Sequence, residues 1–209
     1  KATNSIENIS RILKEICSCP VLYPDGIEFN STNLILIESQ IATEYTGLSA
    51  RFSAHLHTAK LPLRIDIGFS DKIFPKPAQL IYPTLLNFPS PTLQGYTPET
   101  MIAEKLDARV KLGLANSRMK DFYDIWKVLN RFQIEQKTIA PIIKEVFQNR
   151  KTHVRETPKA FSKDFYNAPK TTERWDAFLK SIGHDSIPLE SVIFEIRDFF
   201  LPILQNKGF

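Results

Sequence analysis

The sequence predicts an α+β fold in which a helix and antiparallel strands precede a bundle of helices. Changes in the spacing of the hydrophobic residues carry this prediction. The spacing is helical over residues 5–17, becomes close to two over residues 21–67, and is helical again after residue 97. We therefore expect an α/β domain over residues 1–94 and a helical domain over residues 95–209.

The first domain should begin with a helix from Ser5 to Cys17, because Ser5 can cap it and apolar residues recur behind it at helical spacing. Asp25-Gly26 is a turn signal, and strand-like sequence follows at Ile27–Phe29 and Leu34–Glu38. Two further antiparallel strands should each have an apolar and a polar face. The expected polar faces consist of Arg51, Ser53, His55 and His57 in one strand, and of Arg64 and Asp66 in the next.

Prolines are dense between Phe74 and Pro91, which predicts a connector with one short edge strand at Leu80–Tyr82. We place the domain boundary near this connector. Beyond it, apolar residues at helical spacing predict helices throughout. The three expected last in the chain are Thr138–Gln148, Thr172–Ile182 and Leu189–Leu204, with Pro202 bending or ending the final one.

The stretch from Thr97 to Phe132 predicts two helices joined by a glycine turn. Thr97 followed by Pro98 is a typical helix start, since threonine caps the first turn and proline fits its first position. Gly113 should end the first helix, and Asn116-Ser117 should cap the second.

Charged residues fall inside the apolar faces of both helices. On a helical wheel, Lys105 and Arg109 lie within the apolar arc of the first helix, and Asp121 lies within that of the second, with Asp124 at its edge. The remaining polar residues define the expected solvent faces. These are Thr100, Glu104, Asp107 and Lys111 on the first helix, and Lys120, Lys127 and Arg131 on the second.

An inward lysine and an inward aspartate on neighbouring helices can pair, and unpaired they would be costly to bury. One interpretation is a structural ion pair, Lys105–Asp121, that locks the two helices together. The other is a phosphate-binding lysine that a carboxylate holds in place. The residues alone leave both open.

Composition is that of an ordinary globular protein, with 209 residues, a net charge of +4 and a pI near 9.0. This charge is compatible with a phosphate-bearing partner. No apolar run reaches the roughly 18 residues of a membrane span, and no secretory signal is visible. Cys17 and Cys19 are too close to form a relaxed disulfide, so we expect reduced thiols and a cytoplasmic protein.

Other motifs give weaker signals. His55 and His57 could bind a metal from one strand face, but no further His or Cys lies near them in the sequence, and Cys17-x-Cys19 has no partner motif. P-loop and Rossmann glycine patterns are absent from the sequence. A basic segment within 144–159 is either a solvated face or a phosphate-contacting patch for RNA. Its basic residues include Arg150, Lys151, His153, Arg155 and Lys159.

The stretch PETMIAEKLDARVKLGLANSRMKDFYDIW resembles the AbiEii/AbiGii toxin family of nucleotidyltransferases, the toxin halves of abortive-infection, type IV toxin–antitoxin systems. LPLRIDIGFSD and PKAFSKDFYNAPKTTERWDAFL are similar to a carboxylate-bearing strand and the helical tail of that family. The resemblance spans most of the chain. It implies that residues 1–94 are part of a nucleotidyltransferase α/β domain, with a mixed or antiparallel sheet and a flanking helix.

The resemblance also implies a chemistry. A nucleoside monophosphate would pass from an NTP to an acceptor such as RNA, with Mg²⁺ as the cofactor and an antitoxin as the protein partner. Asp66 would be the third metal-binding carboxylate, and Lys105 would contact the NTP phosphates. Asp121 would orient Lys105 or act as a base, with Asp124 as the alternative to Asp121.

One departure from the family qualifies this reading. The Gly-Gly/Ser turn and the Asp-x-Asp strand of the family should precede the helix at 5–17, and the sequence from Lys1 does not contain them. We therefore expect this chain by itself to be an incomplete and inactive portion of such an enzyme. The alternatives are a degenerate, non-enzymatic module that binds an antitoxin or nucleic acid, and a helical interaction domain in which Lys105–Asp121 is only structural.

Overall fold

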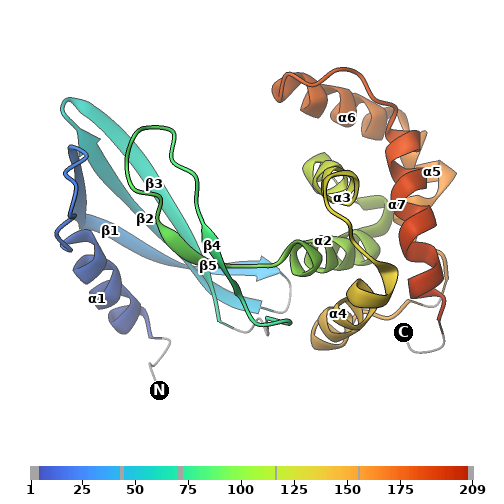
Figure 1. Ribbon diagram of the computed structural model, residues 1–209, viewed down its shortest axis with the longest axis horizontal. Coiled ribbons are helices and arrows are strands. Elements are labelled where there is room, and N and C mark those ends of the chain that lie inside the picture. Colours follow the sequence, from blue (N-terminus) through green and yellow to red (C-terminus); the bar gives the residue numbers. More distant parts are fainter. Residues whose placement is uncertain (1–4, 43–44, 70–72, 116, 155, 207–209) are drawn as a thin grey trace. The chain divides into compact units, whose positions relative to one another are not determined.

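The computed structural model describes residues 5–42, 45–69, 73–115, 117–154 and 156–206 (Figure 1). It has an α+β fold with antiparallel sheets, which confirms the predicted fold class. The chain forms two compact units. Lys1–Asp71 and Thr84–Pro89 make the first, and Lys72–Pro83 and Ser90–Phe209 make the second.

The first unit is a three-stranded antiparallel sheet with one helix packed against its first strand (Figure 1). The predicted helix is present, and the Ser5 hydroxyl caps it by accepting a hydrogen bond from the Asn8 backbone N–H at 3.2 Å. The predicted antiparallel arrangement of the strands is confirmed. The elements are α1 (Ile6–Cys17), β1 (Ile27–Ala42), β2 (Tyr45–Leu56) and β3 (Ala59–Gly68), with the strand order β1-β2-β3.

β1 is one long strand, whereas the sequence predicted two short strand segments. Its register against β2 shifts between Asn30 and Ile35. Across this irregularity the side chain of Asn33 takes over the role of the backbone: its amide donates to Ser53 Oγ at 2.8 Å, and its carbonyl accepts from the Ser53 N–H at 3.2 Å. The strand therefore continues through a polar stretch that has no strand-like pattern.

His57 does not belong to a strand. β2 ends at Leu56, and His57 has a φ of 51°, a left-handed conformation, in the turn that leads to β3. The prediction that His55 and His57 share one face of a strand is therefore wrong, because the alternation of side chains stops where the chain reverses.

The second unit begins with a small hairpin and continues as helices. β4 (Ala78–Ile81) matches the predicted short strand to within one or two residues, and it pairs with β5 (Thr92–Gly95), which the sequence pattern did not predict. The helical elements are α2 (Pro98–Leu112), η1 (Gly113–Ala115), α3 (Met119–Arg131), α4 (Gln136–Asn149), η2 (Lys159–Phe161), α5 (Lys163–Tyr166), α6 (Pro169–Ser181) and α7 (Leu189–Leu204).

The ends of α2 follow the predicted chemistry, and the start of α3 does not. Thr97 Oγ1 accepts from the Thr100 N–H at 3.2 Å, and Gly113 ends α2 with a φ of 50°. α3 is preceded by Arg118 and has no side-chain cap, so Ser117 does not cap it as predicted. Asn116 lies outside the described residues.

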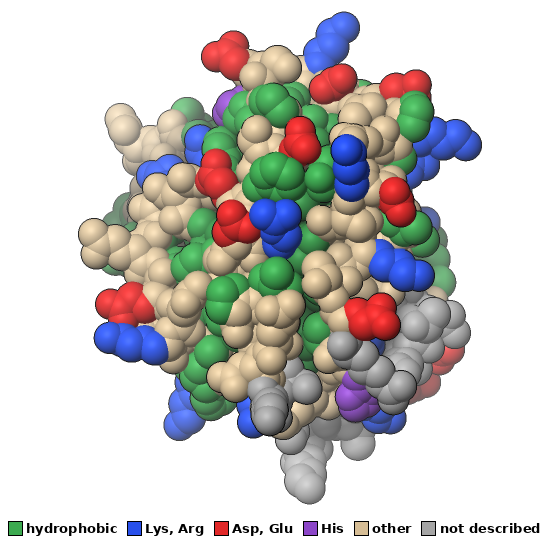
Figure 2. Space-filling model, turned by 90° about the vertical axis from the view of Figure 1, so that its right-hand side faces the viewer, with side chains coloured by type: hydrophobic (Ala, Val, Ile, Leu, Met, Phe, Trp, Pro, Cys, Tyr) green, Lys and Arg blue, Asp and Glu red, His purple; other side chains and the backbone are tan. Residues whose placement is uncertain are grey.

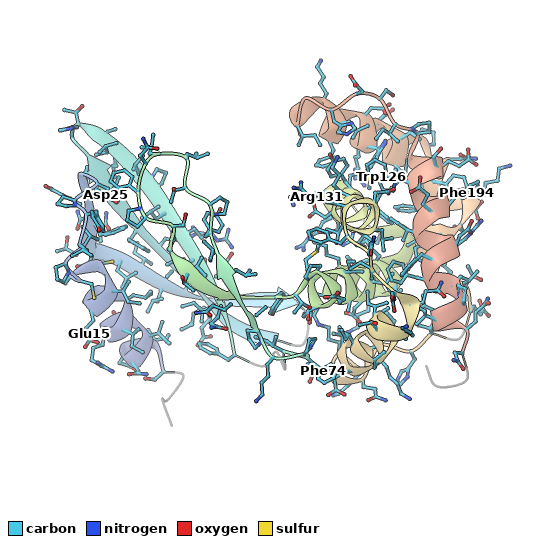
Figure 3. All side chains as sticks on the ribbon, in the orientation of Figure 1. Glu15, Asp25, Phe74, Trp126, Arg131 and Phe194 are labelled. Atoms are coloured by element: carbon cyan, nitrogen blue, oxygen red, sulfur yellow. The ribbon has the colours of Figure 1, made fainter. Side chains whose placement is uncertain are left out.

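One hydrophobic core holds the helices of the second unit together. α2 packs on α3 and α4, and α7 packs on α3 and α4. The indole N–H groups of two tryptophans at this core are hydrogen-bonded. Trp126 Nε1, on α3 in Figure 3, donates to Glu195 of α7 at 2.8 Å, and Trp175 Nε1 donates to the Ile187 carbonyl at 2.6 Å.

The last helix, α7, continues past Pro202 to Leu204. Among the described helices, none combines the length and the apolar character that a membrane crossing requires.

Candidate functional site

The charged residues that the helical wheels turned inward meet between α2 and α3. Lys105 and Arg109 are four residues apart on α2, and Asp121 and Asp124 are three apart on α3, so each pair projects from one side of its helix. Since α2 and α3 pack together, these side chains face one another across the helix interface. We call Lys105, Arg109, Lys120, Asp121 and Asp124 the charged cluster.

The contacts in the charged cluster are short. Lys105 Nζ lies 2.7 Å from Asp121 Oδ1 and 2.8 Å from Asp124 Oδ2, so the predicted Lys105–Asp121 pair is present. Lys120 Nζ lies 2.5 Å from Asp124 Oδ2, and Arg109 Nη2 lies 3.1 Å from Asp121 Oδ2. Three cations therefore surround two carboxylates, and the cluster keeps one net positive charge.

Burial is graded across the charged cluster. The Arg109 side chain has no exposed surface, whereas the side chains of Asp121, Asp124 and Lys105 are 13%, 20% and 22% exposed. The Arg109 guanidinium lies 5.6 Å from the centre of the Phe122 ring, and its Nη1 donates to the Arg118 carbonyl at 3.3 Å. Arg109 is thus the innermost residue, or floor, of the cluster, and Lys105 lies nearer to solvent.

Electrostatics keep Lys105 and Asp124 charged. Burial disfavours the ammonium of Lys105, but its hydrogen bonds to Asp121 and Asp124 outweigh this and raise its pKa. Burial likewise disfavours the carboxylate of Asp124, but hydrogen bonds from Lys105 and Lys120 outweigh it and lower the pKa of Asp124. At neutral pH the cluster therefore presents a fixed ammonium group whose position is set by two carboxylates.

Part of the side of α2 that the wheel assigned to solvent is buried, while Lys111 is exposed as predicted. Thr100 and Asp107 are each only 1% exposed, so the prediction is wrong for both. Thr100 Oγ1 donates to the Phe74 carbonyl at 3.0 Å, and Asp107 accepts from the Thr152 hydroxyl and lies 3.6 Å from Arg150 Nη1. α2 is covered on this side by the chain before it and by the segment after α4, which periodicity within α2 cannot reveal.

Arg150 therefore pairs with acidic side chains of α2 and does not belong to an exposed basic patch. It pairs with Glu104 of α2, and its carbonyl accepts from Lys111 Nζ at 2.6 Å. Lys151, His153 and Lys159 remain exposed, and Arg155 lies outside the described residues. The segment predicted as a possible RNA contact therefore keeps part of its exposed positive charge.

Asp66 lies in the first unit, on β3, with its side chain 45% exposed. It faces Ser49 of β2 across the sheet and lies 2.9 Å from Arg64 Nε. The neighbouring Ser49 side chain and the hydrogen bond from Arg64 hold the pKa of Asp66 below its usual value. Within the part of the chain that the structure describes, no three His, Cys, Asp or Glu side chains come together to form a metal site.

Sequence reasoning did not assign a role to Arg109, although it placed the residue inside the apolar arc of α2. The structure shows that Arg109 and Lys105 bind different oxygens of one carboxylate, that of Asp121. The available signal was the four-residue spacing, which puts two cations on one side of a helix that also faces two aspartates.

Comparison with curated proteins finds no match. A family model described as "Nucleotidyl transferase AbiEii toxin, Type IV TA system" matches residues 2–197, which is most of the chain. The match includes both helices of the charged cluster as well as β3. The chain therefore belongs to the AbiEii family of nucleotidyltransferase toxins of type IV toxin–antitoxin systems.

Proposed function

We propose that this protein takes part in the transfer of a nucleoside monophosphate from an NTP to an acceptor such as RNA, and that the charged cluster contacts the NTP phosphates. The observation that carries the proposal is the Lys105 ammonium, which two carboxylates hold at 2.7 and 2.8 Å near the surface of the α2–α3 interface. An ammonium has three N–H donors, and these contacts use two of them. The third can be donated to a phosphate oxygen.

This arrangement suits phosphoryl chemistry, which depends on positioning and on stabilising negative charge more than on covalent steps. Asp121 already accepts contacts from Lys105 and Arg109, which supports an orienting role for it over that of a base. Asp124 is held in the same way by Lys105 and Lys120. Both aspartates then fix the ammonium, and Arg109 fixes Asp121.

Family membership implies the use of an NTP and a divalent metal ion, and Mg²⁺ is the ion we propose. Asp66 is the candidate ligand by resemblance. The described residues do not fit such an ion by themselves, because Asp66 lies beside Arg64 and is not grouped there with two further ligating side chains.

An antitoxin and an RNA are the proposed macromolecular partners, in the cytoplasm. A type IV toxin family implies the former. For RNA, the supporting feature is the exposed positive charge of Lys151, His153 and Lys159. On the face of the molecule shown in Figure 2, by contrast, acidic and basic side chains are interspersed, so that face offers no continuous basic surface to a nucleic acid.

A non-enzymatic interaction module remains the second candidate, since the complete burial of Arg109 is typical of a structural ion pair. Nucleotide binding separates the two. A ligand that binds only the folded state raises the thermal unfolding midpoint. We expect NTP to stabilise the wild-type protein and the control Lys127→Ala, which removes an exposed lysine of α3, but not Lys105→Ala.

Transfer of label from an α-phosphate-labelled NTP to RNA then tests the reaction itself. The assay uses a longer form of the protein that contains the Gly-Gly/Ser and Asp-x-Asp motifs. In that form the proposal predicts transfer with wild-type Lys105 or Lys127→Ala, and its loss in Lys105→Ala. Equal stabilisation of all three proteins by NTP, together with undiminished transfer by Lys105→Ala, would leave Lys105 with a structural role only.

A further inference from the structure

We infer that a second phosphate-binding subsite adjoins the charged cluster, in an open pocket of about 560 Å³ between the start of α3 and the middle of α6. This inference rests on the proposed function and adds a residue that neither the sequence pattern nor the charged cluster indicated, Arg174. The pocket is lined by Ser117, Arg118, Met119, Lys120, Asp121, Arg174, Ala177 and Phe178.

The charge of this pocket suits a phosphate group. Its lining includes the cations Arg118, Lys120 and Arg174 and a single carboxylate, that of Asp121, which leaves two net positive charges. Asp121 is also the partner of Lys105, so the pocket and the charged cluster share a wall. A ligand with several phosphates could therefore contact Lys105 and the pocket at the same time.

Arg174 is the residue best placed to bind an anion. It is exposed, and it forms no ion pair with any residue that the structure describes, so no carboxylate there competes with a ligand. A guanidinium can donate two parallel hydrogen bonds to phosphate oxygens, which a lysine cannot do. Arg174 also lies more than forty residues after the end of α3 in the sequence, which is why no local motif contains it.

The part of α6 that lines the pocket beside Arg174 is held in place by packing against the core. The neighbouring Trp175 is 1% exposed and donates to the Ile187 carbonyl, which anchors α6 in the core. Phe178, which lines the pocket, packs edge-on against Tyr123 with 5.6 Å between ring centres and lies 5.9 Å from the Trp175 ring. The backbone that carries Arg174 is thus fixed relative to α3, so the pocket exists before a ligand binds.

The ligand chemistry is a phosphate group, from either the triphosphate of an NTP or the backbone of an acceptor RNA. The test measures the affinity of the whole chain for two probes, inorganic triphosphate and a short single-stranded RNA with a 5′-hydroxyl. The variants are Arg174→Ala and Arg174→Lys, and the matched control is Arg131→Ala, which removes an exposed arginine in the last turn of α3 (Figure 3).

We expect Arg174→Ala to weaken binding by about tenfold, the loss of one charge-assisted hydrogen-bonding group, with Arg174→Lys in between and Arg131→Ala unchanged. Weaker binding of triphosphate assigns the pocket to the NTP, and weaker binding of RNA alone assigns it to the acceptor. Unchanged affinity of Arg174→Ala for both probes would overturn the inference. Thermal unfolding of each variant checks that the fold is kept, and Arg174→Lys keeps the charge if Arg174→Ala does not fold.

Lys105→Ala, measured in parallel, separates this inference from the proposed function. One outcome is that Arg174→Ala binds both triphosphate and RNA like the wild type, while Lys105→Ala loses triphosphate binding. In that case the pocket assignment is wrong and the role of Lys105 stands. If the wild-type protein binds neither probe, both are wrong.

Discussion

Arg109 Nη2 lies 3.1 Å from Oδ2 of Asp121, while the other oxygen of that carboxylate, Oδ1, lies 2.7 Å from Lys105 Nζ. One aspartate of α3 is therefore bound at both oxygens by cations one turn apart on α2. The inner cation is completely buried and the outer one reaches the surface. This arrangement fixes the Asp121 side chain, and through it the position of the Lys105 ammonium.

Arg109→Ala should destabilise the protein strongly. It leaves a cavity beside Phe122 and removes the buried partner of Asp121, and breaking a buried ion pair from one side costs about 3 kcal/mol or more. Urea denaturation would measure this as a drop in the free energy of unfolding. Arg131→Ala, at an exposed position on α3, should change that free energy by no more than about 0.5 kcal/mol. Similar values for the two variants would contradict the role of Arg109 as the floor of the cluster.

Asp107 and Asp124 should give stability opposite dependences on pH. Burial raises the pKa of Asp107 above its ordinary 3.8, against the hydrogen bond from Thr152 and the charge of Arg150. The folded state then holds the proton more tightly than the unfolded state, so the contribution of Asp107 to the free energy of unfolding falls as pH rises above 3.8. The pKa of Asp124 is lowered, so its contribution is present above 3.8 and is lost as pH falls through the folded-state pKa.

Denaturation at a series of pH values checks this with Asp107→Asn and Asp124→Asn. The stability advantage of the wild type over Asp107→Asn should shrink as pH rises from 3.8, and its advantage over Asp124→Asn should shrink as pH falls below 3.8. Slopes of the same sign for both variants would show that the environments of the two carboxylates are not as different as the structure indicates.

Asp66→Asn should leave stability nearly unchanged, because the side chain is 45% exposed and its pair with Arg64 lies at the surface. If Asp66 is the metal-binding carboxylate that the family resemblance suggests, nucleotide transfer by a longer form that contains the Gly-Gly/Ser and Asp-x-Asp motifs should nevertheless be lost. Glu28→Gln, at an exposed position of β1, is the matched control and should keep transfer. Transfer at the wild-type level in Asp66→Asn would remove Asp66 from the site.

The sequence was sufficient for features that depend on neighbours along the chain. The Ser5 and Thr97 caps and the end of α2 at Gly113 were all predicted, because each is decided within one helical turn. The inward position of Lys105 was also predicted, since helical geometry relates it directly to the apolar residues around it. These local features were enough to indicate the charged cluster.

Contacts between distant segments could not be predicted in this way. Asp107 was expected to face solvent, but Thr152 and Arg150, more than forty residues later, cover it. β5 had no strand-like pattern of its own and is defined by its pairing with β4. Arg174 lines the same pocket as Asp121 because α6 packs against α3. In each case the deciding partner is remote in sequence, so periodicity carries no information about it.

The account depends most on Lys105 as a ligand for phosphate, and calorimetric titration of NTP into the wild-type protein, Lys105→Ala and the control Lys127→Ala tests it most directly. We expect Lys105→Ala to bind NTP at least about tenfold more weakly, while Lys127→Ala binds it like the wild type. Circular dichroism should show that all three proteins are folded. Equal affinities of Lys105→Ala and the wild type for NTP would contradict the account.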